Sequence, residues 1–106
     1  MRTGQFRIDF DDIPWQSPLP GCRFKATVRG DRQVRLLEFT SDFIEPHWCE
    51  KAHTGVVLEG ELELDFHGEI ERYPQGSGLF MPAGPDGAHK ARSLTDRVLL
   101  FLVEDI

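Results

Sequence analysis

The chain has 106 residues and a formal net charge of -6, with 18 acidic and 12 basic residues spread along it. A chain of this length is typical of one domain with its own core, so residues 1–106 are expected to form a single domain. The acidic balance argues against a nucleic-acid-binding surface and against a surface for anionic membranes, because both require clustered basic residues.

The cysteines and the apolar runs indicate where the protein resides. Cys22 and Cys49 are too few for a disulfide framework, and no basic segment followed by an apolar one opens the chain. The longest apolar run, Val98 to Val103, has six residues, whereas a helix that crosses a bilayer needs roughly 20. These features predict a reduced, cytoplasmic protein without a membrane span.

Short stretches of alternating apolar and polar residues follow one another along the chain and predict β-strands. The expected strands are residues 6–10, 22–28, 33–40, 54–58, 61–66, 69–73, 79–81, 88–93 and 96–104. Residues 13–21 contain three prolines and are expected to form an extended loop. About nine short strands, with turns of Gly and Pro and no helix, favour an all-β sandwich or barrel.

The direction of several side chains follows from this alternation. Cys22 shares a face with the apolar residues of its strand and is expected in the core, and either Glu38 or Arg35 faces inward. The unbroken run Val98 to Val103 indicates a strand buried on both faces. His67, beside Gly68 at the polar end of a strand, is expected in an exposed turn and outside any site.

Candidate chemistry concentrates in Pro46 to Gly60, which reads PHWCEKAHTGVVLEG. On an extended strand, His47 and Cys49 leave the same face about 7 Å apart. On one straight strand His53 would lie about 20 Å from His47, so it joins them only if the chain turns between Cys49 and His53. Trp48 and Glu50 have the opposite parity and are expected to point outward. If the chain bends early, Glu50 replaces Cys49 in the site.

This segment resembles the first signature of the cupin family, which runs G, five residues, H-x-H, three or four residues, E, six residues, G. His47 takes the place of the first histidine and Cys49 that of the second. His53 occupies the position of the glutamate in the signature, and Gly60 occupies that of the closing glycine. Ser41 occupies the position of the opening glycine, which is therefore absent.

A later segment resembles the second cupin signature, which runs G, five residues, P-x-G, two residues, H, three residues, N. Gly76 and the triplet that begins at Pro82 agree with it, and His89 follows that triplet after four residues instead of two. Ser93 stands where the signature has asparagine. The resemblance covers roughly residues 42–92, and it implies a small jelly-roll barrel with a metal inside.

The resemblance implies that His47, Cys49, His53 and His89 point into the barrel mouth and bind one divalent transition metal. Cysteine in place of histidine, and histidine in place of the carboxylate, make this donor set softer than in the family pattern. Softer donors favour iron or zinc, with nickel or copper as alternatives, over magnesium or calcium, and make manganese less favoured. Phe39, Met81 and Phe101 are candidates for the apolar lining of the mouth, and Arg35 is the candidate inward cation.

Two functions fit this reading. The first is a metal-dependent enzyme, of oxygenase or isomerase/hydrolase type, that acts on a small organic molecule inside the barrel. The second is a non-catalytic module that binds or senses a small ligand, with a structural metal or none. The fold does not choose between them, because one barrel hosts many activities. The resemblance also implies a homodimer.

Overall fold

The computed structural model describes residues 6–106, which form nine β-strands and two single-turn 3-10 helices. The strands are β1 (Gln16–Leu19), β2 (Cys22–Arg29), β3 (Arg32–Thr40), β4 (His53–Glu59), β5 (Leu62–Phe66), β6 (Glu69–Tyr73), β7 (Gly78–Met81), β8 (Lys90–Ser93) and β9 (Arg97–Asp105). The 3-10 helices are η2 (Phe10–Asp12) and η3 (Pro85–Gly87).

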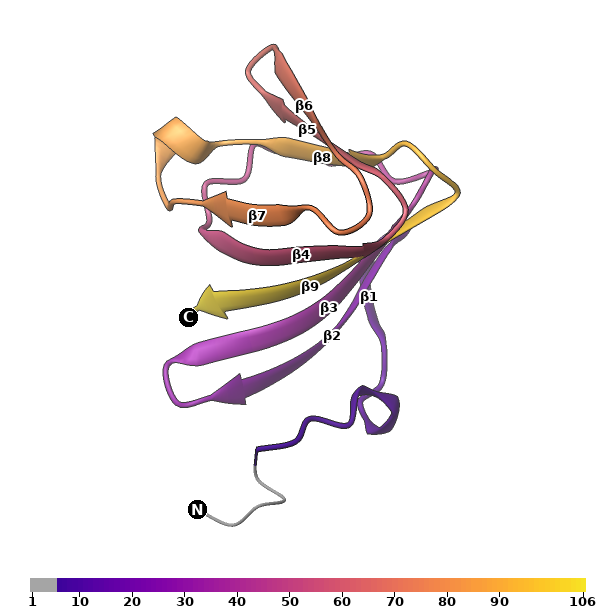
Figure 1. Cartoon of the computed structure of the whole chain (residues 1–106), viewed down its shortest axis with the longest axis vertical. Coiled ribbons are helices and arrows are strands. Elements are labelled where there is room, and N and C mark those ends of the chain that lie inside the picture. The colour runs from indigo at the N-terminus through magenta and orange to yellow at the C-terminus, as the bar shows by residue number, and fades with distance from the viewer. Residues whose placement is uncertain (1–5) are drawn as a thin grey trace.

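The strands form two antiparallel sheets that face each other (Figure 1). The larger sheet has the order β1-β2-β3-β9-β4-β7, and the smaller has the order β6-β5-β8. The chain passes from β4 in the larger sheet to β5 in the smaller one, and from β8 back to β9. This arrangement is a jelly-roll barrel, which confirms the predicted all-β fold.

The core fills the space between the two sheets. It takes leucines from both, because alternate residues of each strand point inward. On β9, for example, Val98, Leu100 and Leu102 are at most 3% exposed. Cys22, at 8% exposed, is part of this core, as predicted.

Eight of the nine expected strands are present with small shifts of their ends. The expected strand at residues 6–10 is wrong, because Phe10 instead begins η2 and residues 7–9 belong to no strand. Contacts with the outside of the larger sheet replace strand pairing here. The Phe10 ring packs edge-on against Phe101, with ring centres 6.3 Å apart, and the Phe10 carbonyl accepts a 2.7 Å hydrogen bond from Lys25 Nζ.

The expected loop at residues 13–21 contains a short strand, β1, which pairs with the first residues of β2. Its register is irregular, and it lies at the edge of the sheet. An edge strand tolerates Pro18, because one side of its backbone needs no hydrogen-bond donor. Trp15 lies over Arg23, with the guanidinium carbon 4.2 Å from the ring centre.

Within residues 6–106 no helix is long and apolar enough to cross a bilayer. Cys22 and Cys49 are both free thiols.

Candidate metal centre

The segment between β3 and β4 brings Cys49 next to His89. The two residues form an isolated antiparallel bridge, in which Cys49 N donates to His89 O (2.8 Å) and His89 N donates to Cys49 O (3.0 Å). The expected extended strand at residues 47–49 is therefore reduced to this one bridge. The chain then turns, and β4 begins at His53, so the turn that the sequence required between Cys49 and His53 is present.

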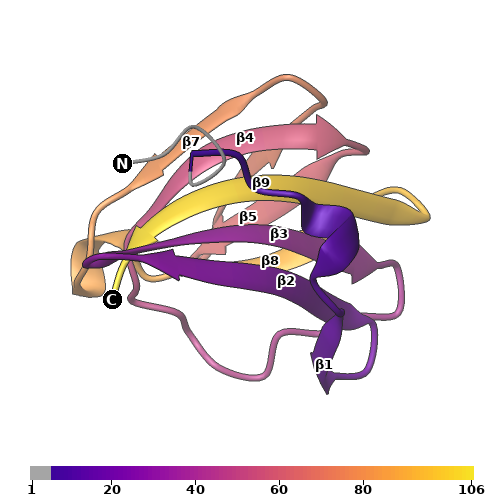
Figure 2. The same cartoon turned by 90° about the horizontal axis from the view of Figure 1, so that it is seen from below.

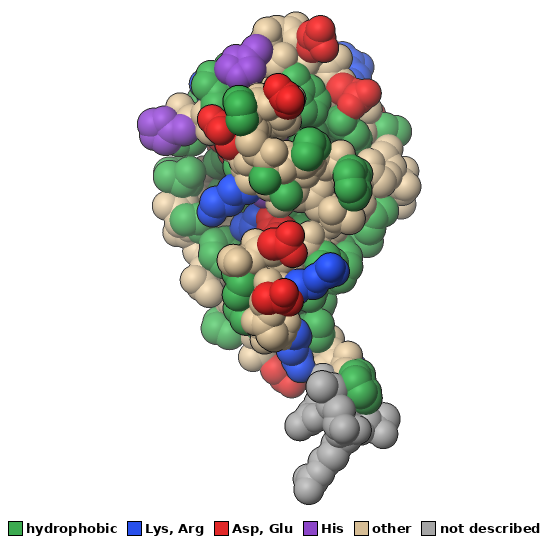
Figure 3. Space-filling view, turned by 90° about the vertical axis from the view of Figure 1, so that its left-hand side faces the viewer, with side chains coloured by type: hydrophobic (Ala, Val, Ile, Leu, Met, Phe, Trp, Pro, Cys, Tyr) green, Lys and Arg blue, Asp and Glu red, His purple; other side chains and the backbone are tan. Residues whose placement is uncertain are grey.

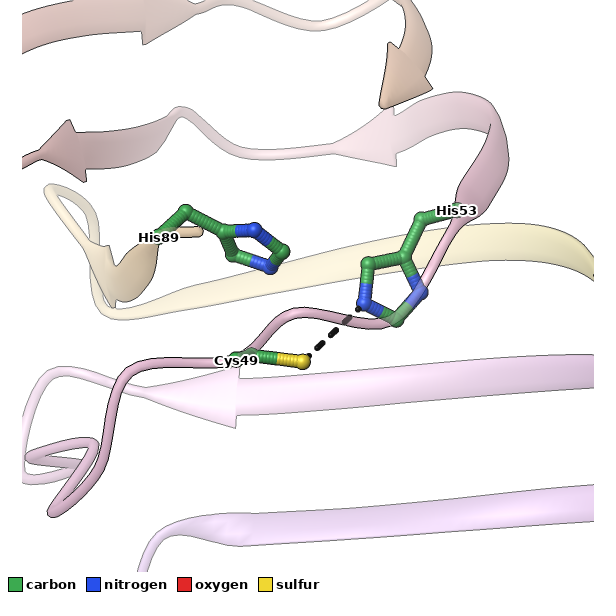
Figure 4. Close-up of side chains that lie close together, drawn as sticks. All are labelled: Cys49, His53 and His89. Carbon is green, nitrogen blue, oxygen red and sulfur yellow. Dashed lines mark hydrogen bonds between the residues drawn. The ribbon is translucent and has the colours of Figure 1, made fainter. Parts of the chain in front are cut away.

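Three donor side chains converge at the end of the barrel where β4 begins (Figure 4). One donor atom each from Cys49, His53 and His89 lies within 4.8 Å of the other two. The Cys49 Sγ is 3.5 Å from His53 Nε2, and the two imidazole rings meet edge-on with centres 5.2 Å apart. Both histidines are buried, at 7% and 3% exposed, and Cys49 is half-buried. The spacing is small enough for one metal ion to contact all three.

The outer nitrogen of each imidazole is held by a fixed partner. His89 Nδ1 donates to the carbonyl of Gly87 (2.8 Å), and His53 Nδ1 donates to the carboxylate of Glu104 (2.6 Å). A proton fixed on Nδ1 leaves Nε2 as the donor atom of the neutral ring. Metal-binding histidines in proteins are oriented in this way, so the two rings fit a metal centre.

The carboxylate of Glu104, which accepts the hydrogen bond from His53, also accepts hydrogen bonds from two other side chains. Its carboxylate accepts a bidentate pair of hydrogen bonds from Arg35 (2.6 and 2.8 Å) and a further one from Gln33 (3.1 Å). Burial raises the pKa of Glu104, but the hydrogen bonds from His53 and Arg35 outweigh it and lower the pKa to about 2. Glu104 is therefore a carboxylate at neutral pH and holds His53 in place.

The proton distribution in the cluster follows from these contacts. Hydrogen bonds from His53 and His89 lower the pKa of Cys49 to about 5, against the opposing effect of burial. Burial lowers the pKa of His53, but its hydrogen bonds to Cys49 and Glu104 outweigh burial and raise the pKa to about 9. At pH 7 the metal-free cluster thus contains a thiolate beside an imidazolium.

The cluster opens on a cavity of about 230 Å³ inside the barrel. Its wall is mainly apolar, with contributions from both sheets. Arg35, Glu45 and Lys51 add charged groups to this wall, and burial raises the pKa of Glu45. Figure 3 looks onto this end of the molecule, where Lys and Arg side chains border a hollow.

Solved structures with the same architecture exist, whereas no family model and no curated protein matches the sequence. KdgF from Halomonas sp. is 23% identical, with a TM-score of 0.73 over 91% of this chain and 89% of that one. A cupin-2 domain containing protein from Shewanella frigidimarina NCIMB 400 is 20% identical, with a TM-score of 0.61 over 76% of each chain. The chain has the cupin fold.

A structure of HppE with Fe(II) also matches this cupin fold. It is 15% identical, with a TM-score of 0.72, and the alignment covers 92% of this chain but 58% of the HppE chain. Because these identities are low, the likenesses establish the fold alone.

Within the cupin barrel, three of the four predicted ligands come together, and His47 does not join them. Its side chain is exposed and lies outside the cluster, because residues 46–48 are not in the straight strand that would align His47 with Cys49. His47 is left out of the ligand set proposed below. Glu50, the alternative to Cys49, is also exposed and outside the cluster.

The remaining expectations concern the cavity wall and the surface. Phe39 and Met81 line the cavity, as predicted. The prediction for Phe101 is wrong, because its neighbours Leu100 and Leu102 on β9 take the inward positions. His67 is exposed in a turn with a positive φ of 55°, as expected, and its ring stacks on Trp48 with centres 3.9 Å apart.

The sequence reasoning missed Glu104, although a signal was present. Glu104 has the parity of Leu100 and Leu102 on the last strand and so faces the inside of the barrel. A carboxylate at an inward position requires a partner, and Arg35 faces the same interior. Parity therefore placed Glu104 among the inward side chains, and Arg35 was one of two candidates for an inward charge on its own strand.

Proposed function

We propose that Cys49, His53 and His89 bind one divalent transition metal, and that this cupin is a metal-dependent enzyme acting on a small organic molecule in the barrel. The observation that carries the proposal is the convergence of three donor atoms whose imidazoles are oriented through Nδ1. Iron and zinc are favoured, with nickel or copper as alternatives, since imidazole and thiolate are borderline and soft donors.

The number of ligands supports catalysis over a structural role. Structural zinc sites are closed by four protein ligands, whereas catalytic sites keep a position for water or substrate. Three ligands beside a cavity leave such a position. A bound iron would supply oxygenase chemistry there, and a bound zinc would supply hydrolase or isomerase chemistry.

The cavity limits what the enzyme accepts. A cavity of about 230 Å³ admits a small molecule. Because the cavity wall is mainly apolar, it favours a molecule with an apolar carbon skeleton over a strongly hydrated polar one. Arg35 and Lys51 offer positive charge for a polar or anionic end of that molecule. Glu45 is placed in the same wall, and its raised pKa suits it to exchange a proton with the bound molecule.

A second candidate is a non-catalytic cupin that binds or senses a small ligand, with a structural metal or none. The favouring observation is that Cys49 and His53 already satisfy each other through a hydrogen bond. Among residues 6–106, no buried side-chain nitrogen or oxygen lacks a partner. The polar side chains of the cavity therefore have hydrogen-bond partners without a metal ion, which is compatible with a pocket that binds a small ligand.

Metal content tests the proposal. Protein purified without an affinity tag or chelator is expected to carry about one equivalent of metal per chain by elemental analysis, and the double variant His53→Ala, His89→Ala is expected to carry none. The matched control is His47→Ala, which is expected to keep the metal because His47 lies outside the cluster. Absence of metal from the wild type, even after anaerobic reconstitution with each candidate ion, would refute the metalloenzyme and leave the ligand-binding cupin.

The affinity for the metal is expected to rise with pH. With the pKa of Cys49 at about 5 and that of His53 at about 9, the metal must displace a proton from His53 but none from Cys49 at neutral pH. The proton displaced from His53 makes the affinity rise at least about tenfold per pH unit between about pH 6 and 8. Burial lowers the pKa of His89, but its hydrogen bond to Cys49 outweighs burial and raises that pKa, which steepens the rise at the lower end of this range. Competition with a chromophoric chelator across this range measures the slope. A slope of zero after correction for the chelator's own protonation would contradict the assigned proton distribution.

A further inference from the structure

Cys49, His53 and Glu104 form a relay in which one imidazole lies between a thiol and a carboxylate. Cys49 Sγ is 3.5 Å from Nε2 of His53, and Nδ1 of the same ring donates to Glu104 (2.6 Å). Nucleophilic catalysis uses the same geometry: a nucleophile lies beside a base, and a third group orients the base. The relay can therefore activate a thiol without a metal ion.

The strands fix the base and the carboxylate that orients it. His53 begins β4, and Glu104 lies near the end of β9, which has β4 on one side and β3 on the other (Figure 2). Arg35 of β3 holds the Glu104 carboxylate through two hydrogen bonds (2.6 and 2.8 Å). Because this carboxylate occupies Nδ1 of His53, Nε2 is the nitrogen left to exchange a proton with Cys49.

The nucleophile faces the cavity. Cys49 is half-buried and lines the cavity of about 230 Å³ together with His53, and its sulfur points toward the His53 ring (Figure 4). A small molecule in the cavity can therefore place a carbonyl carbon against Sγ. Burial raises the pKa of Cys22, the other thiol of the chain, which makes it a poor nucleophile.

Hydrogen-bond donors lie close to the position where negative charge would develop during attack on a carbonyl. The backbone N–H of Lys51 donates to Cys49 Sγ, so it lies near an oxygen on the carbon that Sγ attacks. The Lys51 side chain lines the same cavity and adds a positive charge. Donors placed in this way stabilise the oxyanion of acyl transfer. The surroundings of Cys49 therefore favour a carbonyl substrate.

We propose that Cys49 is the nucleophile of an acyl-transfer activity and that His53 is its general base and acid. The substrate class is a small ester or thioester whose acyl group enters the cavity. This activity goes beyond the proposed metal-dependent enzyme. The two exclude each other at any one moment, because both use Cys49 Sγ and His53 Nε2.

The reaction balances with water as its co-reactant. Cys49 Sγ, after passing its proton to His53 Nε2, bonds to the acyl carbon while the bond from that carbon to the alcohol or thiol breaks. The leaving atom takes the proton from Nε2. Water then gives a proton to Nε2 as its oxygen bonds to the acyl carbon and the bond to Sγ breaks. This step releases the carboxylic acid and restores the thiolate beside the imidazolium.

Hydrolysis of p-nitrophenyl acetate tests the proposal. The protein is kept in a chelator, so the result does not depend on whether the site binds metal. The wild type is expected to release about one equivalent of p-nitrophenolate per chain in a burst, followed by slower steady turnover. Mass spectrometry of peptides from the burst is expected to find the acetyl group on Cys49 and not on Cys22. Cys49→Ala is expected to lose both the burst and the turnover.

The dependence on His53 separates the relay from a thiol that is merely exposed. His53→Gln is expected to slow acetylation of Cys49 about 100-fold or more, the usual contribution of a general base. The matched control is His47→Ala, which is expected to react at the wild-type rate because His47 is exposed and outside the cluster. Circular dichroism verifies that each variant is folded.

Three results would overturn the proposal. The first is a wild type without a burst, or with the acetyl group on residues other than Cys49. The second is an acetyl group on Cys49 that is never hydrolysed. The third is a folded His53→Gln variant that is acetylated as fast as the wild type.

Discussion

Glu104→Ala is expected to lower the free energy of unfolding of the metal-free protein by about 3–5 kcal/mol, the range for breaking a buried ion pair by removal of one partner. The carboxylate of Glu104 is 8% exposed and receives hydrogen bonds from Arg35 and His53. Without it, the half-buried guanidinium of Arg35 and the Nδ1 of His53 both lose the acceptor that they share. Urea denaturation at pH 7 in the presence of a chelator measures the loss.

Substitution of Glu104 is also expected to lower the affinity of the site for the metal. Glu104→Gln keeps the volume of the side chain but replaces the carboxylate that fixes Nδ1 of His53, and metal affinity is expected to fall about 10–100-fold. The matched control is Glu63→Gln, because Glu63 is equally buried, pairs with Arg92 and lies outside the cluster. Its metal affinity is expected to match that of the wild type. Equal affinities for Glu104→Gln and Glu63→Gln would show that Glu104 does not position His53.

The pH dependence of stability provides an independent check on Glu104. Its pKa is lowered from the usual 4.5 to about 2 in the folded protein. A lowered pKa gives a stabilising contribution that is complete above the unfolded-state pKa and is lost as the pH falls from about 4.5 towards 2. The metal-free wild type is therefore expected to lose more stability over this range than Glu104→Gln does. Parallel pH profiles of the two proteins would contradict the assignment.

Much of the barrel was predictable because alternation reports which face of a strand is buried, and this protein alternates clearly along β2 and β5. The apolar run of β9 does not alternate, and the burial on both faces that it predicted is wrong, because Leu99, Phe101 and Val103 are only partly buried. The pattern failed at the N-terminal segment, where Phe6 to Phe10 alternates but makes no strand pairing. An alternating segment needs an adjacent strand edge, and the sequence does not say which edges are free. There, Phe10 packs by its side chain on Phe101 instead.

The candidate site was predictable to the extent that it depends on local geometry. Cys49 and His53 come together through a turn that the spacing required, and the second motif supplied His89. Strand parity and the first cupin signature both place His47 with Cys49, whereas the bridge between Cys49 and His89 fixes Cys49 alone. Glu104 is 51 residues from His53, and its contact depends on the pairing of β4 with β9, which parity does not specify.

Gly55→Ala is expected to have the second largest effect on stability. A Cβ at Gly55 would overlap the backbone carbonyl of Phe101, across the pairing of β4 with β9. Backbone atoms of a central strand cannot move aside cheaply, so the free energy of unfolding is expected to fall by about 3 kcal/mol, at the upper end of the usual cost of overpacking. Urea denaturation of the metal-free protein measures the loss.

The effect of Gly55→Ala is also expected to reach the metal centre. Gly55 is two residues after His53, and displacement of β4 from β9 separates the His53 ring from Glu104. Metal affinity is therefore expected to fall by about tenfold or more, as it does when the partner of a ligand histidine is lost.

The chain offers a matched control for Gly55→Ala in Gly78, which is also in a strand and pairs with the same β4. A Cβ at Gly78 would have its nearest contact at 3.8 Å, an ordinary van der Waals distance. Gly78→Ala is expected to change stability by about 0.5 kcal/mol or less and to leave metal affinity unchanged. If Gly55→Ala were as stable as Gly78→Ala, the close approach of β4 and β9 at the site would be wrong. If it were destabilised but bound metal normally, the pairing of these strands would not be what positions His53.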